Sequence, residues 1–71
     1  GAAGVVGDRI AVLARWGHLY LVDPRDGQTE LIGEGLDLAH ELAVSPDGAR
    51  IAAVAIGPDG ISLDVFVVDV A

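Results

Sequence analysis

The chain has no cysteine, no methionine and no lysine, and Trp, Tyr and Phe each occur only once among its 71 residues. Without cysteine no disulfide can staple the fold, and two histidines alone cannot supply the three or four ligands of a zinc site. A chain of this length lies near the lower limit of about 70 to 80 residues at which one core supports a fold unaided. We therefore expect part of its stability to come from contact with other protein surface.

Positive charge is scarce as well, because four arginines stand against 11 acidic residues and the formal net charge is −7. This charge repels both a nucleic-acid backbone and an anionic membrane surface, so neither is expected as a partner. The sequence has no apolar run near the ~18 residues of a membrane helix, and Gly1–Gly4 lacks the features of a signal peptide. An initial Gly and the lack of Met suggest an excised fragment, so the compartment stays open.

Apolar residues of moderate size dominate what is present: hydrophobic residues make up 52% of the chain and the mean hydropathy is +0.53. Most are Ala, Val, Ile and Leu, which favour flat, closely stacked sheets. Their pattern predicts an all-β fold with six short strands, at 9–14, 18–22, 28–32, 41–44, 50–56 and 63–70. The segment 36–43 also approximates helical spacing, but it is short and flanked by strands, so we interpret 36–40 as a loop.

Three Asp-Gly pairs lie between the expected strands, at Asp26-Gly27, Asp47-Gly48 and Asp59-Gly60. This pair tolerates the positive φ of tight hairpin turns, so consecutive strands are expected to pair antiparallel. A proline precedes each pair, at a place where its missing N–H does not disturb a ladder: Pro24, Pro46 and Pro58.

Two of the expected strands are apolar on both faces, at 51–56 and 65–68. Since neither alternates with polar residues, each should be covered above and below, as in a sheet that lies between two others. The segment 28–32 instead gathers its polar residues at one end, as expected of an outer, partly solvated strand. The sequence therefore predicts stacked antiparallel sheets that become more exposed toward their outer strands.

The sequence repeats itself once. Arg9–Ala14 aligns with Arg50–Ala55 at a shift of 50 − 9 = 41 residues, and Leu19–Asp23 aligns with Val65–Asp69 at a shift of 69 − 23 = 46. The five additional residues fall in the hairpin around Asp59-Gly60, because insertions are tolerated best in turns. One four-stranded propeller blade occupies about 40 to 45 residues, so the period fits one blade.

The segment Glu41–Ala52, which reads Glu-Leu-Ala-Val-Ser-Pro-Asp-Gly-Ala-Arg-Ile-Ala, resembles the TolB-like, WD-repeat-like β-propeller repeat. Its most specific part is the turn motif Ser45-Pro46-Asp47-Gly48, followed by Arg-Ile-Ala. In the first copy Gly4-Val5-Val6-Gly7 stands in place of that turn and keeps only its last Gly. The resemblance implies antiparallel four-stranded propeller blades, about one and a half in this chain, as an open fragment of a closed β-propeller.

On this interpretation residues 1–35 form an incomplete first blade with strands two to four, and residues 36–71 form a second blade that lacks its outer strand. A propeller needs about 4 to 8 blades to close, so the chain should join copies of itself or dock onto the remaining blades of its parent. We therefore expect protein partners and a homo-oligomer. By resemblance alone, the compartment would be periplasmic or extracellular.

Residues suited to nucleophilic catalysis are few. Ser45, Ser62 and Thr29 carry the hydroxyl groups, and none stands in a Gly-x-Ser-x-Gly elbow. Ser45 opens a turn, where its hydroxyl is expected to bond the local backbone. We therefore predict that the chain has no catalytic residues and is not an enzyme.

Candidate ligand sets for a metal are equally weak. Asp23, Asp26 and Glu30 place three carboxylates in one hairpin, but the spacing is not that of an EF-hand loop, so turn chemistry explains them better than a cation does. His18 and His40 are separated by a whole strand pair, which favours surface or hydrogen-bonding roles. We therefore expect neither a metal nor another cofactor.

Trp16 and His18, in the short hairpin between the first two expected strands, are the candidate protein contacts. Large aromatic residues in exposed turns are enriched in binding surfaces, but the sequence favours packing of Trp16 over an adjacent turn.

The leading functional hypothesis is a protein-interaction scaffold, since TolB-like propellers are mostly binding platforms. Two alternatives stay open: part of a propeller attached to a hydrolase such as an oligopeptidase, or an isolated or engineered half-propeller made to study blade assembly. Fold alone does not separate them.

Overall fold

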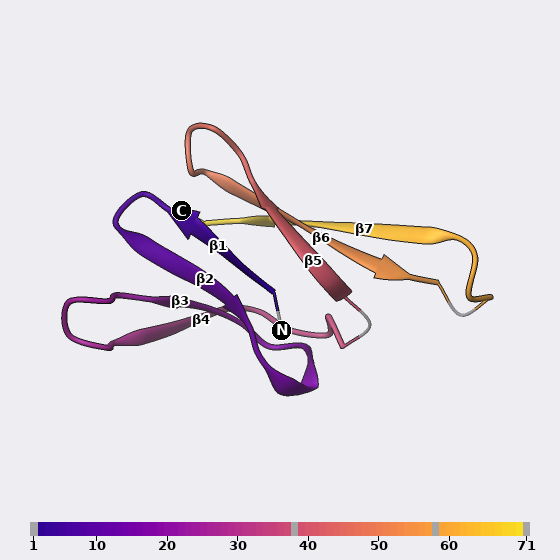
Figure 1. Ribbon diagram of the computed structural model, residues 1–71, viewed down its shortest axis with the longest axis horizontal. Helices are drawn as coiled ribbons and strands as arrows, with labels where there is room; N and C mark the ends of the chain where they lie inside the picture. The colour runs from indigo at the N-terminus through magenta and orange to yellow at the C-terminus, as the bar shows by residue number, and fades with distance from the viewer. Residues whose placement is uncertain (1, 38, 58, 71) are drawn as a thin grey trace.

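The computed structural model describes residues 2–37, 39–57 and 59–70, which form seven strands in two antiparallel sheets (Figure 1). The first sheet has the order β1 (Ala3–Val6), β2 (Arg9–Leu13), β3 (Leu19–Val22) and β4 (Thr29–Gly33). The second has the order β5 (Ala39–Val44), β6 (Arg50–Ile56) and β7 (Leu63–Asp69). A single turn of 3-10 helix, η1 (Arg15–Gly17), joins β2 to β3. The predicted all-β fold is confirmed, and the sheets stay open, as in a fragment of a propeller.

Every strand pairs antiparallel with the next one in its sheet, as the Asp-Gly turns predicted. Gly27, Gly48 and Gly60 have φ values of 75°, 72° and 73°. In each pair the preceding Asp accepts a hydrogen bond from the backbone N–H two residues later, at 2.9–3.0 Å. The turns therefore use Asp as an acceptor and Gly for its left-handed backbone. Pro58, which was predicted to precede the third turn, lies outside the described residues.

The first sheet has four strands, one more than the three that the sequence predicted within residues 1–35. The additional strand is β1, which the sequence does not predict because Gly4–Gly7 aligns with the turn motif 45–48. In the structure Val6 and Arg9 are paired, which leaves a two-residue turn, whereas Val44 pairs with Ile51 across a longer loop. Because the first turn is shorter, Val5, which pairs with Ile10, is the structural equivalent of Val44, which pairs with Ile51. The second sheet has three strands, as expected.

The strand register confirms the internal repeat for the two strands that follow. Ile10 pairs with Val22 in the first sheet, and the equivalent Ile51 pairs with Val68 in the second. Likewise Val12 pairs with Tyr20, and Ala53 pairs with Phe66. The two sheets are therefore equivalent strand by strand, with β1, β2 and β3 matching β5, β6 and β7.

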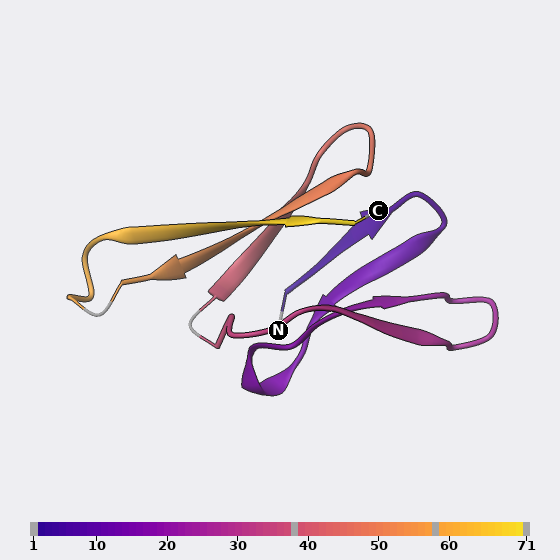
Figure 2. The same ribbon diagram turned by 180° about the vertical axis from the view of Figure 1, so that it is seen from behind.

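The core lies between the two sheets, which lie side by side in both views, with β1 next to β5 (Figures 1 and 2). Its largest fully buried side chains are Leu19 and Leu21 of β3 and Ile51 of β6. Gly4 brings β1 close to β5, because a Cβ at this position would lie 2.9 Å from Val44 Cγ2. Leu36, from the connection between the sheets, is also buried and joins this core.

The strands at the sheet edges are more exposed than the inner ones. β4 is the last strand of the first sheet and begins with three exposed residues, which confirms the prediction of an outer strand at 28–32. The predicted loop at 36–40 is shorter than expected, since β5 begins at Ala39, and Leu38 lies outside the described residues. Among the residues described here, no helix has the length and apolar character needed to cross a membrane.

Candidate functional site

Each sheet has two faces, because successive side chains of a strand point to opposite sides. We call the face that carries Leu19 and Leu21, and the equivalent face of the second sheet, the leading face. The opposite face, which carries Ile51 in the second sheet and Ile10 in the first, is the trailing face. Within the chain, the leading face of the first sheet packs against the trailing face of the second. The interface therefore joins two different faces.

One face of each sheet is left open. The leading face of the second sheet presents a row of apolar side chains from all three of its strands, namely Ala43, Ala52, Val54, Ile56, Leu63, Val65 and Val67. The trailing face of the first sheet presents a second apolar row, namely Val5, Ile10, Val12, Tyr20, Val22 and Leu31. Both sides of the molecule that point away from its core therefore carry apolar residues.

Equivalent positions show how much cover the open faces lack. Leu19 and Leu21 are 0% and 2% exposed, whereas their equivalents in β7, Val65 and Val67, are 60% and 63% exposed. The sequence predicted that 51–56 and 65–68 would be covered on both faces. Within the described chain 51–56 is covered on one face only, and 65–68 is covered on one face in part, since Phe66 on that face is 41% exposed. The second face of each segment is open to solvent.

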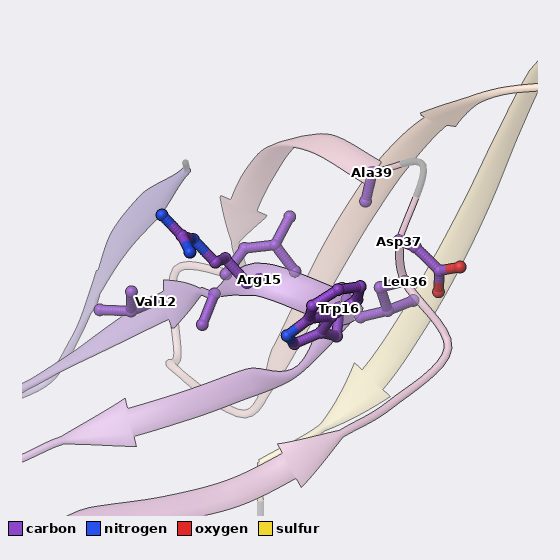
Figure 3. Close-up of a pocket in the computed structure, with 9 residues that line it drawn as sticks. Val12, Arg15, Trp16, Leu36, Asp37 and Ala39 are labelled. Atoms are coloured by element: carbon purple, nitrogen blue, oxygen red, sulfur yellow. The ribbon is translucent and has the colours of Figure 1, made fainter.

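The hairpin that joins β2 to β3 presents Trp16 to solvent (Figure 3). Trp16 is 82% exposed and is the only described residue other than glycine with a positive φ, at 68°. A non-glycine residue costs about 1–2 kcal/mol in this left-handed conformation. The conformation is held by Gly17, whose carbonyl accepts a hydrogen bond of 3.1 Å from Leu36 N. The Trp16 side chain therefore lies in solvent instead of packing over an adjacent turn.

A hollow of about 570 Å³ lies beside this hairpin, where the connection between the sheets passes it (Figure 3). Its lining combines the end of β2, the hairpin and the connection, namely Val12, Leu13, Ala14, Arg15, Trp16, Gly17, Leu36, Asp37 and Ala39. His18, the other predicted contact, is half-buried and lies against Tyr20, with 3.4 Å between His18 Nδ1 and the Tyr20 hydroxyl. Trp16 and His18 thus lie at the end of the first sheet, beside its open trailing face.

The turn motif Ser45-Pro46-Asp47-Gly48 forms a closed hydrogen-bond set. The Ser45 hydroxyl donates to Asp47 Oδ1 at 2.6 Å and accepts from Arg50 N at 3.0 Å. The hydrogen bond from Ser45 lowers the pKa of the Asp47 carboxyl, with a further contribution from Ala49 N. These bonds hold the β5–β6 hairpin in register, as predicted for a structural turn.

The hairpin carboxylates are occupied by arginines and by backbone groups. Asp23 accepts hydrogen bonds from Arg25, which lower its pKa to about 2. Glu30 accepts a hydrogen bond of 3.3 Å from Arg9, and Asp26 accepts one from the backbone of its own turn. Within 2–37, 39–57 and 59–70, no group of three His, Asp or Glu side chains is arranged to hold a metal ion.

The remaining hydroxyl and imidazole groups are scattered. Ser62 donates to both carboxylate oxygens of Asp59 at 2.7 Å, which makes it part of the β6–β7 turn. Thr29 is exposed at the start of β4, and His40 is exposed on β5. The structure therefore does not bring the candidate nucleophiles and histidines together.

The open faces could have been anticipated from the sequence, since their signal is the two strands that are apolar on both faces. The left-handed Trp16 could not, because it depends on the packing of Gly17 against a distant segment. In the comparisons with known proteins, no family model, no curated protein and no solved structure matches this chain.

Proposed function

We propose that this chain is a non-catalytic protein-interaction module of the β-propeller repeat type, whose open sheet faces bind further protein sheets. The observation that carries the proposal is the exposure of Val65 and Val67 at positions whose equivalents in the first sheet are buried. Apolar side chains left in water favour cover by another apolar surface.

Two features support the propeller type. Sequential antiparallel strands make up both sheets, and the sheets share one register, so the chain is a repeat of a single sheet unit. In the second sheet this unit carries the Ser45–Gly48 turn that resembles the TolB-like, WD-repeat-like repeat. Repeat units of this kind bury a continuous core only by stacking on neighbours, so two units leave their end faces to be covered.

The non-catalytic character is supported by what the polar groups do. The hydroxyls of Ser45 and Ser62 are bound to the carboxylates of their own turns, and His18 lies against Tyr20. These groups stabilise hairpins instead of converging on a common point. Trp16, exposed at the rim of the first sheet, adds an aromatic contact of the kind that is enriched in protein interfaces.

The test uses a variant with one charge on the open leading face, Val67→Asp, and a control with the same change of charge, Gln28→Asp, in an exposed turn. In dilute solution the wild type and the control should bind a dye that fluoresces on apolar surface, and the face variant should bind much less. Circular dichroism checks that all three chains are folded. Equal dye binding by all three folded chains would contradict the proposal.

A further inference from the structure

The two open faces of this chain correspond to the two halves of the interface that it already forms internally. Inside the chain, the leading face of the first sheet is covered by the trailing face of the second. What stays open is the leading face of the second sheet and the trailing face of the first. The chain therefore presents on its two outer sides one surface of each kind.

We propose that a second copy of this chain covers the open leading face of the second sheet with the open trailing face of its own first sheet. This pairing rests on the proposed function and names its partner. The pairing repeats the internal interface between two copies. Val65 and Val67 would occupy the positions that Leu19 and Leu21 occupy inside the chain. Ile10 and Val12 of the next copy would occupy the positions of Ile51 and Ala53.

The pairing is head to tail, because the two surfaces that meet are different. Until a ring closes, a head-to-tail complex of any size keeps one open leading face and one open trailing face, so further copies can be added. Such growth ends in a ring if the rotation closes and in a filament if it does not. With two sheets per chain and about 4 to 8 sheets in a propeller, a closed ring would hold roughly two to four copies.

One internal contact identifies a specific contact between copies. Gly4 of β1 lies against Val44 of β5, and the equivalents of these residues are Ala43 and Val5. Ala43 of one copy should therefore lie against Val5 of the next. A Cβ at Gly4 would lie 2.9 Å from Val44 Cγ2, so the methyl of Ala43 requires these strands to lie slightly further apart between copies.

Charge on the open leading face is confined to its margins. Glu41 lies on the edge strand β5, and the exposed pair Arg50 and Asp69, 3.3 Å apart, closes one end of the face. The centre of the face, on β6 and β7, is apolar. Apolar burial is therefore the driving force for pairing, and the net charge of −7 on each copy opposes it.

The experiment blocks each open face separately and then mixes the two blocked chains. Val67→Asp places a charge on the open leading face, and Val5→Asp places one on the open trailing face. Both positions are exposed in the single chain, at 63% and 71%, so each variant should fold. Gln28→Asp serves as the control with the same change of charge. The molar mass is measured by light scattering over a range of concentrations at about 0.15 M salt.

The wild type and Gln28→Asp should grow beyond the monomer mass as the concentration rises, and each face variant alone should stay monomeric. An equimolar mixture of Val67→Asp and Val5→Asp should give a 1:1 heterodimer of twice the monomer mass, because each chain retains the face that the other lacks. This restoration is specific to head-to-tail pairing.

Three outcomes would overturn the pairing, and they bear differently on the proposed function. If one face variant still dimerises alone, two identical faces meet, so the pairing is wrong while binding through the faces stands. If the wild type stays monomeric but binds apolar dye, the pairing is wrong and the open faces bind a different protein. If neither substitution changes the mass or the dye binding, the proposed function fails as well.

Discussion

At the scale of single residues, the hairpins depend on a few contacts between neighbouring side chains and backbone. Each Asp-Gly turn pairs a carboxylate acceptor with a glycine of positive φ, and both roles follow from the residue types. These turns were predictable because every interaction in them is local. The conformation of the hairpin at Trp16 was not, since it depends on a segment about twenty residues away.

Gly17 is the residue on which that hairpin depends most. A Cβ at this position would overlap Asp37 N, whereas a Cβ at Gly27, which has a similar positive φ, meets nothing within 4 Å. Gly27→Ala should cost about 1–2 kcal/mol of unfolding free energy for its conformation alone. Gly17→Ala should cost a further ~1–3 kcal/mol, because the backbone must move apart. Urea unfolding of both variants at one protein concentration measures the difference, and equal losses would contradict it.

Asp59 should make the β6–β7 turn sensitive to acid. Hydrogen bonds from Ile61 N, Ser62 N and the Ser62 hydroxyl lower its pKa from the usual 3.8 to about 2. Because the folded pKa is depressed, the stabilisation is fully present above about pH 4 and is lost as the pH falls through about 2. Carbon-detected NMR titration of the carboxyl should give a midpoint near 2. A midpoint near 3.8 would mean that these bonds do not persist in solution.

At the scale of strands, the repeat was readable wherever the two copies keep the same spacing. β2 aligns with β6, and β3 aligns with β7, without gaps inside the strands, so their equivalence was predicted and the register confirms it. The five additional residues of the second copy fall in the turn between β6 and β7. β1 was missed because the turn after it has only two residues and because Gly4 weakens its strand signal. A weak strand of this kind is assigned by its pairing partner, which the local sequence does not reveal.

Equivalent strands also differ in cover, and this difference can be measured. Leu21→Ala should cost about 2–5 kcal/mol of unfolding free energy, because it leaves a cavity between the sheets. Val67→Ala, at the equivalent exposed position, should cost less than about 0.5 kcal/mol in a dilute, monomeric sample. Chemical denaturation below the concentration of association compares the two. Similar losses would show that Val67 is already covered in the single chain.

At the scale of the whole molecule, the chain exposes apolar sheet faces and carries an excess of negative charge. Its core holds together two sheets, yet both outer sides keep apolar rows that water must solvate. The sequence predicted that the strands apolar on both faces would be covered on both sides. In the structure the single chain leaves one face of each sheet exposed. Which protein supplies it could not be predicted from composition, because it depends on how the two faces of the repeat are arranged.

The most direct test of head-to-tail pairing is a disulfide between copies, and the lack of any native cysteine gives it a clean background. Val5→Cys and Ala43→Cys are prepared as separate chains, mixed and oxidised gently, and the products are identified by mass spectrometry after digestion. Head-to-tail pairing should give, as the main product, a disulfide that joins Cys at position 5 of one chain to Cys at position 43 of the other. Homodimers of each variant alone, or no dimer at all, would contradict it.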